Sequence, residues 1–220
     1  MNIFKTGLLT TFTALSLTCA GIASATIIFE TGNNPQADEQ NILFNGPGTI
    51  SGPALTVTGR TNQTDTVVAF TSSENLVTPA SGQARVEGAD GAFQDLSVYL
   101  QAGGTFSDLI FNLNTPNAED GNALITVHQL VGADATYNLA LGNGQNFLTI
   151  LAIDGQRITS VDINSGIGVN MVNIDDGRQF RISGIQGPTT VPEPAAVWLL
   201  GIGLLGMAGM RRKGKRQVRN

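Results

Sequence analysis

The chain has 220 residues, of which 41% are hydrophobic, 6% aromatic and 13% charged, and its net charge is −5 at pH 7. The charge is uneven, because residues 26–190 hold sixteen acidic side chains against five arginines and no lysine, a net charge of −11. This acidic part is long enough for one domain with a real core, and it excludes nucleic acid as a partner because phosphate groups would repel it.

Residues 1–25 have the pattern of a secretory signal peptide, with a helical apolar part. Lys5 supplies the positive start, an uncharged and mostly apolar stretch follows, and Ala23 and Ala25 fit the A-x-A cleavage rule. We predict cleavage after Ala25, with the Sec translocon and signal peptidase as partners; an uncleaved anchor is the alternative. Cys19 would be lost with this segment, which excludes disulfides, thiolate metal sites and Cys–His catalysis in the mature chain.

Short runs of alternating apolar residues recur between residues 26 and 185 and are typical of β-strands. They predict strands at 55–58, 66–70, 84–86, 96–100, 109–113, 124–131, 147–153, 158–163 and 180–185. Asp154-Gly155, between two of these runs, predicts a β-hairpin. We therefore predict that residues 26–185 form an all-β passenger domain, a β-sandwich or jelly roll, followed by a linker over 186–191.

No group of residues in this domain predicts catalysis. His128 is the only histidine, and a serine triad built on it would lack the Gly-x-Ser-x-Gly elbow. We expect it to be a structural or surface residue of a strand. No spacing selects two carboxylates as a glycosidase pair, and no phosphate-binding loop is present. We expect no enzymatic activity, no catalytic residue, no cofactor and no metal site.

Calcium and carbohydrate are the weaker binding candidates. One loop gathers oxygen-bearing side chains that suit Ca²⁺, namely Asn112, Asn114, Asn117, Glu119 and Asp120. Asp175-Asp176-Gly177 is a second acidic turn, but neither stretch matches a known calcium loop, and ordinary turns are the preferred interpretation. The passenger has no tryptophan and only Tyr99 and Tyr137 as tyrosines, which counts against tight sugar binding.

The C-terminal tail has three parts in a fixed order. Pro192, Glu193 and Pro194 come first, and the prolines exclude a helix interior there. Residues 195–210 are uncharged and apolar; as a helix they would span roughly 24 Å, somewhat less than the ~30 Å core of a bilayer. A basic block follows, formed by Arg211, Arg212, Lys213, Lys215 and Arg216. We predict a single transmembrane helix with a cytoplasmic C-terminus, and a buried core helix is the alternative.

This order of motif, apolar run and basic block, over residues 192–216, resembles a PEP-CTERM protein-sorting signal. The resemblance implies recognition at Pro192-Glu193-Pro194 by an exosortase, a transpeptidase-like membrane protease. It also implies a Gram-negative bacterium that makes exopolysaccharide or biofilm. The precursor would be anchored in the inner membrane and its product would reach the cell surface or the medium. The resemblance implies no activity for the passenger.

We therefore expect an exported structural or interaction protein of the cell surface or extracellular matrix, associated with exopolysaccharide or biofilm. The alternative is a membrane-anchored β-sandwich module that binds carbohydrate or calcium.

Overall fold

The computed structural model describes residues 26–79, 85–166 and 172–188, which form β-strands and one short 3₁₀ turn. The strands are β1 (Thr26–Thr31), β2 (Gln40–Leu43), β3 (Ala54–Thr61), β4 (Val67–Val77), β5 (Arg85–Gly88), β6 (Asp95–Leu100), β7 (Asp108–Asn114), β8 (Gly121–Gln129), β9 (Ala135–Leu141), β10 (Asn146–Ile153), β11 (Ile158–Asn164) and β12 (Asp176–Ser183), with the turn η1 (Pro116–Ala118). The prediction of an all-β fold is confirmed.

The predicted signal helix and transmembrane helix lie outside the described residues. Within 26–79, 85–166 and 172–188, no helix has the length and apolar character that a membrane span requires.

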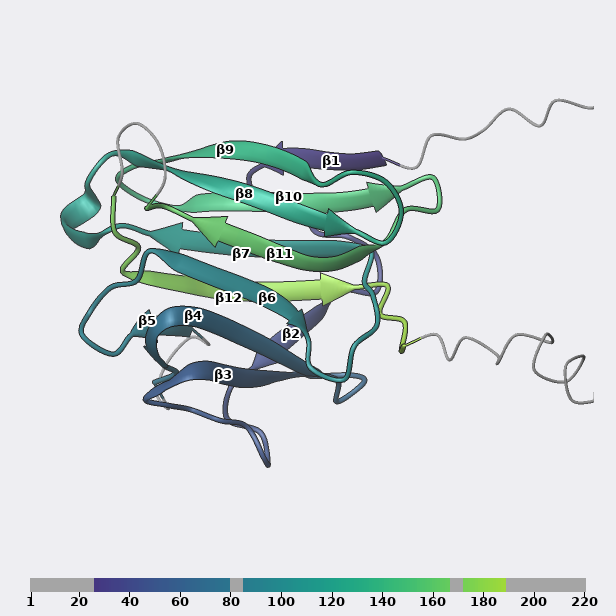
Figure 1. Ribbon diagram of the computed structural model, residues 1–220, viewed down its shortest axis with the longest axis horizontal. Coiled ribbons are helices and arrows are strands. Elements are labelled where there is room, and N and C mark those ends of the chain that lie inside the picture. The colour runs from purple at the N-terminus through teal and green to yellow at the C-terminus, as the bar shows by residue number, and fades with distance from the viewer. Residues whose placement is uncertain (1–25, 80–84, 167–171, 189–220) are drawn as a thin grey trace, which may run out of the picture.

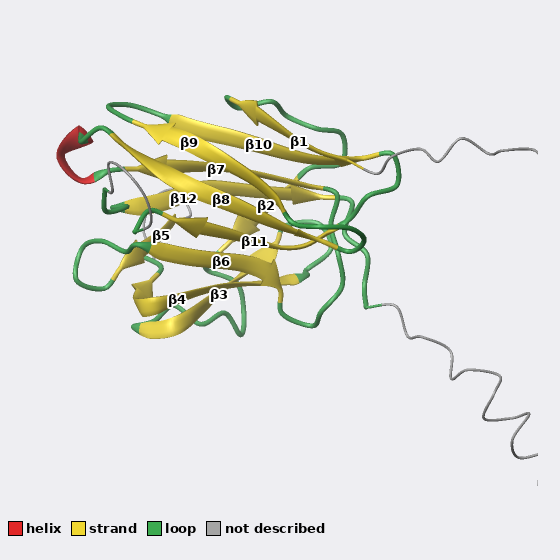
Figure 2. Ribbon diagram, turned by 45° about the horizontal axis from the view of Figure 1, so that its top comes forward, coloured by secondary structure: helices red, strands yellow, loops and turns green. Residues whose placement is uncertain are grey.

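The strands form one hydrogen-bonded path that folds back on itself. Its order is β1-β10-β7-β12-β2-β3-β4-β6-β11-β8-β9, and β5 pairs with both β12 and β4. Two facing layers result, with β1, β10, β7 and β12 behind and β9, β8, β11, β6 and β4 in front (Figures 1 and 2). The two ends of the path meet across the layers, where the rings of Phe29 and Tyr137 stack with centroids 5.1 Å apart.

The core lies between these layers. In most strands every second side chain points into it. In β6 and β8, buried and half-buried residues alternate along the strand, as a half-exposed sheet requires. Phe70 of β4 and Phe180 of β12 join the two layers, with ring centroids 4.8 Å apart, and Phe111 packs on Phe180 at 5.9 Å.

Strand β7 is covered on both of its faces. Every residue of Asp108–Leu113 is buried, including Ile110 on the face away from the core. The connection between β1 and β2, residues 32–39, has to cross β10, β7 and β12, because β1 and β2 lie on opposite sides of these strands. We call residues 32–39 the crossover segment. The Asn34 amide donates to Thr149 Oγ1 of β10 at 3.1 Å, which fixes the segment to the outer face of the back layer.

The predicted hairpin at Asp154-Gly155 is wrong, although the turn itself forms. Asp154 and Gly155 have φ values of 54° and 82°, and the Gln156 amide donates to the Ile153 carbonyl at 3.0 Å. However, β10 pairs with β1 and β7, whereas β11 pairs with β6 and β8. Because both sides of β10 are occupied, the chain passes after the turn to the front layer.

Several strand boundaries also differ from the predicted ones. The strand predicted at 180–185 begins at Asp176 and ends at Ser183, and the one predicted at 124–131 is β8, which ends at Gln129. Strands β1, β2 and β9 were not predicted. β1 and β9 are the end strands of the sheet, and β2 has only four residues.

Candidate functional site

His128 lies on the outer face of the front layer, between two aspartates. Its Nδ1 is 2.9 Å from Asp134 Oδ2, and its Nε2 is 2.9 Å from Asp162 Oδ2. Ionised carboxylates only accept hydrogen bonds, so the arrangement favours the imidazolium form of the ring, in which both nitrogens donate. The hydrogen bond to Asp162 is the main cause that raises the pKa of His128 above its usual value. A ring held in this way is not free to act as a general base.

Stability is therefore expected to fall as the pH rises above the ordinary histidine pKa of about 6.5 and through the raised pKa of His128 in the folded chain. The pKa of His128 is higher in the folded chain than in the unfolded one, so its contribution is complete below the unfolded pKa and is lost above the folded one. The side chain is 35% exposed, which limits the loss to less than about 1 kcal/mol. Urea unfolding of the wild type and of His128→Gln, repeated over a series of pH values that spans this change, measures the loss of stability. An equal pH dependence in both proteins would contradict this assignment.

A row of small polar residues crosses the same face, beside Asp162. Thr56, Thr71, Ser97, Asp162 and Thr126 stand opposite one another on β3, β4, β6, β11 and β8. Thr71 Oγ1 shares hydrogen bonds with Thr56 Oγ1 at 2.9 Å and with the Tyr99 hydroxyl at 3.2 Å, and Ser97 donates to Asp162. An open cleft lies against this row, lined by Tyr99, Ser160, Asp162 and the backbone of Gly103-Gly104. We call it the Tyr99 cleft.

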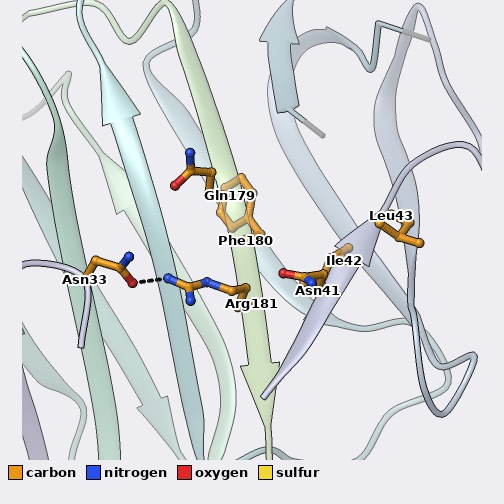
Figure 3. A pocket seen from close by; sticks show the side chains of 7 residues that line it. All are labelled: Asn33, Asn41, Ile42, Leu43, Gln179, Phe180 and Arg181. Atoms are coloured by element: carbon orange, nitrogen blue, oxygen red, sulfur yellow. Dashed lines mark hydrogen bonds between the residues drawn. The ribbon is translucent and has the colours of Figure 1, made fainter. Parts of the chain in front are cut away.

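A second cleft opens where β2 separates from β12 (Figure 3). The two strands pair only at Asn41–Arg181 and Gln40–Ile182, and β2 then turns to pair with β3. The opening holds about 380 Å³ and is lined by Asn33, Asn41, Ile42, Leu43, Gln179, Phe180 and Arg181. We call it the Arg181 cleft.

Arg181 joins this cleft to the crossover segment. Its Nη1 is 2.9 Å from Glu39 Oε2, and its Nη2 donates to Asn33 Oδ1, the contact drawn in Figure 3. The side chains of Arg181 and Glu39 are only 17% and 10% exposed. Their charges compensate each other, so the rim of the cleft offers mainly amide groups. Such a rim can bind hydroxyl groups, but it holds no nucleophile or general base.

The two stretches considered for calcium, around Asn114 and around Asp176, lie side by side in the structure. The positive charge beside Asp176 comes from the guanidinium of Arg178. Asn114 donates to Asp176 Oδ1 at 3.1 Å, and Asp176 is 2% exposed. Arg178 Nε donates to the same carboxylate at 2.7 Å, so a guanidinium neutralises it. Asn112 is buried in β7, whereas Asn117, Glu119 and Asp120 are exposed. Within the described ranges, no group of three His, Cys, Asp or Glu side chains is placed to hold a metal ion.

Asp108, the first residue of β7, has a buried carboxylate that the sequence did not single out. Asp108 is 5% exposed and accepts hydrogen bonds from Ser107 and Ser183, and burial raises its pKa above the usual value. Arg157 lies nearby and donates to the carbonyls of Thr105 and Gly184. Ser107-Asp108 carries no recognisable motif, so only the packing of β7 against β12 reveals this cluster. Its hydrogen bonds join the start of β7 to the end of β12.

The site residues predicted from the sequence all lie outside the described ranges: Ala23, Ala25, Pro192, Glu193, Pro194, Arg211, Arg212, Lys213, Lys215 and Arg216. A family model described as the PEP-CTERM protein-sorting motif matches residues 190–213. The chain carries a PEP-CTERM protein-sorting motif. The family prediction is therefore confirmed, and the match includes Pro192-Glu193-Pro194.

The PEP-CTERM match supports an exported precursor that passes a membrane in a Gram-negative bacterium and is sorted by an exosortase, a membrane protein. No curated protein and no solved structure gives a significant match to this PEP-CTERM protein.

Proposed function

We propose that this PEP-CTERM protein is a structural or interaction protein of the cell surface or extracellular matrix, associated with exopolysaccharide or biofilm. Signal peptidase removes residues 1–25, and the helix over 195–210 with its basic block holds the precursor in the inner membrane. Exosortase cleavage at the motif then releases the passenger. The observation that carries this proposal is the sorting motif at 190–213, which directly follows a folded β-domain.

The passenger's polar groups support a role without catalysis. Both nitrogens of His128 are held by carboxylates, and the buried carboxylate of Asp176 is neutralised by Arg178. The Arg181 guanidinium is compensated by Glu39 in the same way. These side chains hold strands and connections in place, and none of them is left as a free acid, base or nucleophile in a cleft.

Replacing Pro192, Glu193 and Pro194 together with alanine is expected to abolish tail removal. Intact mass is measured on the protein from membranes and from medium separately. The wild type should yield a soluble species that begins at Thr26 and lacks residues 195–220, whereas the variant should keep them and stay with the membrane. Pro188→Ala, just before the matched residues, is the control and should be processed normally. Normal processing of the triple variant would refute sorting through this motif.

A carbohydrate-binding module is the second candidate, and the two open clefts, which combine apolar surface with hydroxyl or amide groups, favour it. The Tyr99 cleft pairs a tyrosine ring with hydroxyl groups, and the Arg181 cleft has an amide rim over a partly apolar floor. This function predicts that the host polysaccharide raises the melting temperature of the passenger. Tyr99→Ala or Asn41→Ala should remove the increase and thereby identify the cleft. No increase with the wild type would exclude this candidate.

A further inference from the structure

The passenger begins and ends at the same end of its two layers (Figures 1 and 2). Thr26, the first residue of β1, stands opposite Ile153, the last residue of β10. Thr105 and Gln186 exchange two backbone hydrogen bonds of 2.9 and 2.7 Å, which hold the chain at this end until shortly before the sorting motif. We call this the exit end. The chain leaves the domain towards the sorting motif from this end, so this end lies nearest to the tail.

Exposed apolar side chains gather at the exit end. Leu130 and Val131, in the turn between β8 and β9, are 53% and 68% exposed, and Ile153 is 37% exposed. They are three of the six exposed large hydrophobic residues found in the described ranges. Large exposed apolar side chains that gather at one end of a domain can mark a contact with a protein or a membrane.

These residues are held in place rather than left on loose loops. Gln156 is 5% exposed, and its Nε2 donates to Gln129 Oε1 at 2.6 Å and to the Val131 carbonyl at 2.8 Å. The Leu130 amide donates to the Arg157 carbonyl at 2.9 Å, so the turn of Leu130 and Val131 is joined to the turn after Ile153. The buried Gln156 amide thus joins the two turns at the exit end. We call their exposed apolar side chains, Leu130, Val131 and Ile153, the apolar tip.

We propose that this apolar tip rests on the bilayer that holds the sorting tail. The inference rests on the proposed function, because it requires the tail to be inserted. Ala195, the first residue of the apolar run, follows Pro188 by seven positions. Seven residues reach at most roughly 25 Å, so an inserted tail keeps the exit end close to the lipid surface.

The contact is apolar and depends on the tether. The acidic passenger gains nothing electrostatically from an anionic bilayer, and Asp134 and Asp154 flank the tip. Three apolar side chains bind a bilayer weakly by themselves, but the tail supplies a high effective concentration. Cleavage of the tail therefore removes the contact and lets the passenger leave the membrane.

Fluorescence quenching in the reconstituted precursor that begins at Thr26 and keeps the sorting tail tests this proposal. Without residues 1–25 this chain has no native cysteine, so Val131→Cys alone carries an environment-sensitive NBD label. Glu119→Cys, beside η1 at the opposite end of the layers (Figure 2), is the matched control. The vesicles contain phosphatidylethanolamine, phosphatidylglycerol and a doxyl-labelled lipid as quencher. Trp198, the only tryptophan, reports insertion of the tail in the same sample.

We expect quenching at position 131 to be severalfold stronger than at 119, and to fall to the level of 119 when Leu130 and Ile153 are changed to asparagine. Equal quenching at 131 and 119, with Trp198 quenched, would overturn the tip contact and leave the proposed function standing. An unquenched Trp198 would overturn both. Protection of the label without vesicles that increases with protein concentration would assign the tip to a second copy of the chain and also overturn the proposal.

Discussion

Changing Arg181 to methionine is expected to lower the free energy of unfolding by about 3 kcal/mol. The change leaves the Glu39 carboxylate, which is 10% exposed, without its cationic partner at 2.9 Å. It also removes the donor that holds Asn33, so the crossover segment loses two of its attachments to β12. Methionine keeps most of the side-chain volume, and the loss therefore reports the ion pair more than packing.

Urea unfolding of Arg181→Met, Glu39→Gln and the double variant measures this effect as a double-mutant cycle. The double variant should cost less than the sum of the two single variants, because it leaves no buried charge unpaired. Arg60→Met is the control, since its partner Asp65 is 76% exposed and such a pair contributes less than about 1 kcal/mol. A cost for Arg181→Met no greater than that for Arg60→Met would show that the crossover segment does not depend on this pair.

Changing Phe180 to alanine is expected to cost about 4 kcal/mol. Its ring is 1% exposed and contacts Phe70 of the opposite layer and Phe111 of the neighbouring strand. The truncation removes the contact between the layers and leaves a cavity that β-strands cannot close by shifting, because their hydrogen bonds fix their spacing.

Leu55→Ala provides the comparison for Phe180→Ala, because Leu55 is 53% exposed and its removal should change stability by less than about 0.5 kcal/mol. Thermal or urea unfolding followed by far-ultraviolet circular dichroism is sufficient for both variants. Similar stability of the two would mean that the layers are not joined through Phe180. Because Phe180 and Arg181 both line the Arg181 cleft, neither variant is suitable for testing sugar binding; Asn41→Ala changes the rim and spares the core.

Local sequence patterns located most of the interior strands of this protein. The runs at 96–100 and 109–113 become β6 and β7, since alternating or continuous apolar residues need only their own neighbours to indicate an extended, buried segment. β9 was not predicted, although exposed residues such as Thr136 and Asn138 alternate in it with buried or half-buried ones, as expected of a strand. Only two of its inward positions, Leu139 and Leu141, are aliphatic side chains larger than alanine.

Local sequence patterns could not predict the candidate surface sites, because the residues of each site are distant from one another in the sequence. His128 was predicted to be a structural or surface residue of a strand, but its two aspartates come from β11 and from the turn after β8. The sequence did not indicate a role for Arg181, because its partners lie in the crossover segment, which is close to it only in the folded domain. The Asn114–Asp176 contact likewise joins residues far apart in the chain.

The sorting tail could be identified from the sequence by itself, because a linear signal consists of consecutive residues whose order and composition are what a membrane and a protease recognise. The all-β class also followed from the sequence, since strand patterning is local. Only the tertiary structure decided which strands are neighbours. The turn at Asp154-Gly155 formed as its residues require, yet the chain left β10 because β1 and β7 already occupied its hydrogen-bonding edges. The same long-range pairing brought Leu130, Val131 and Ile153 to the exit end, where Gln156 holds two turns together. Such contacts depend on which segments compete successfully for buried positions. This cannot be predicted from any single stretch of sequence.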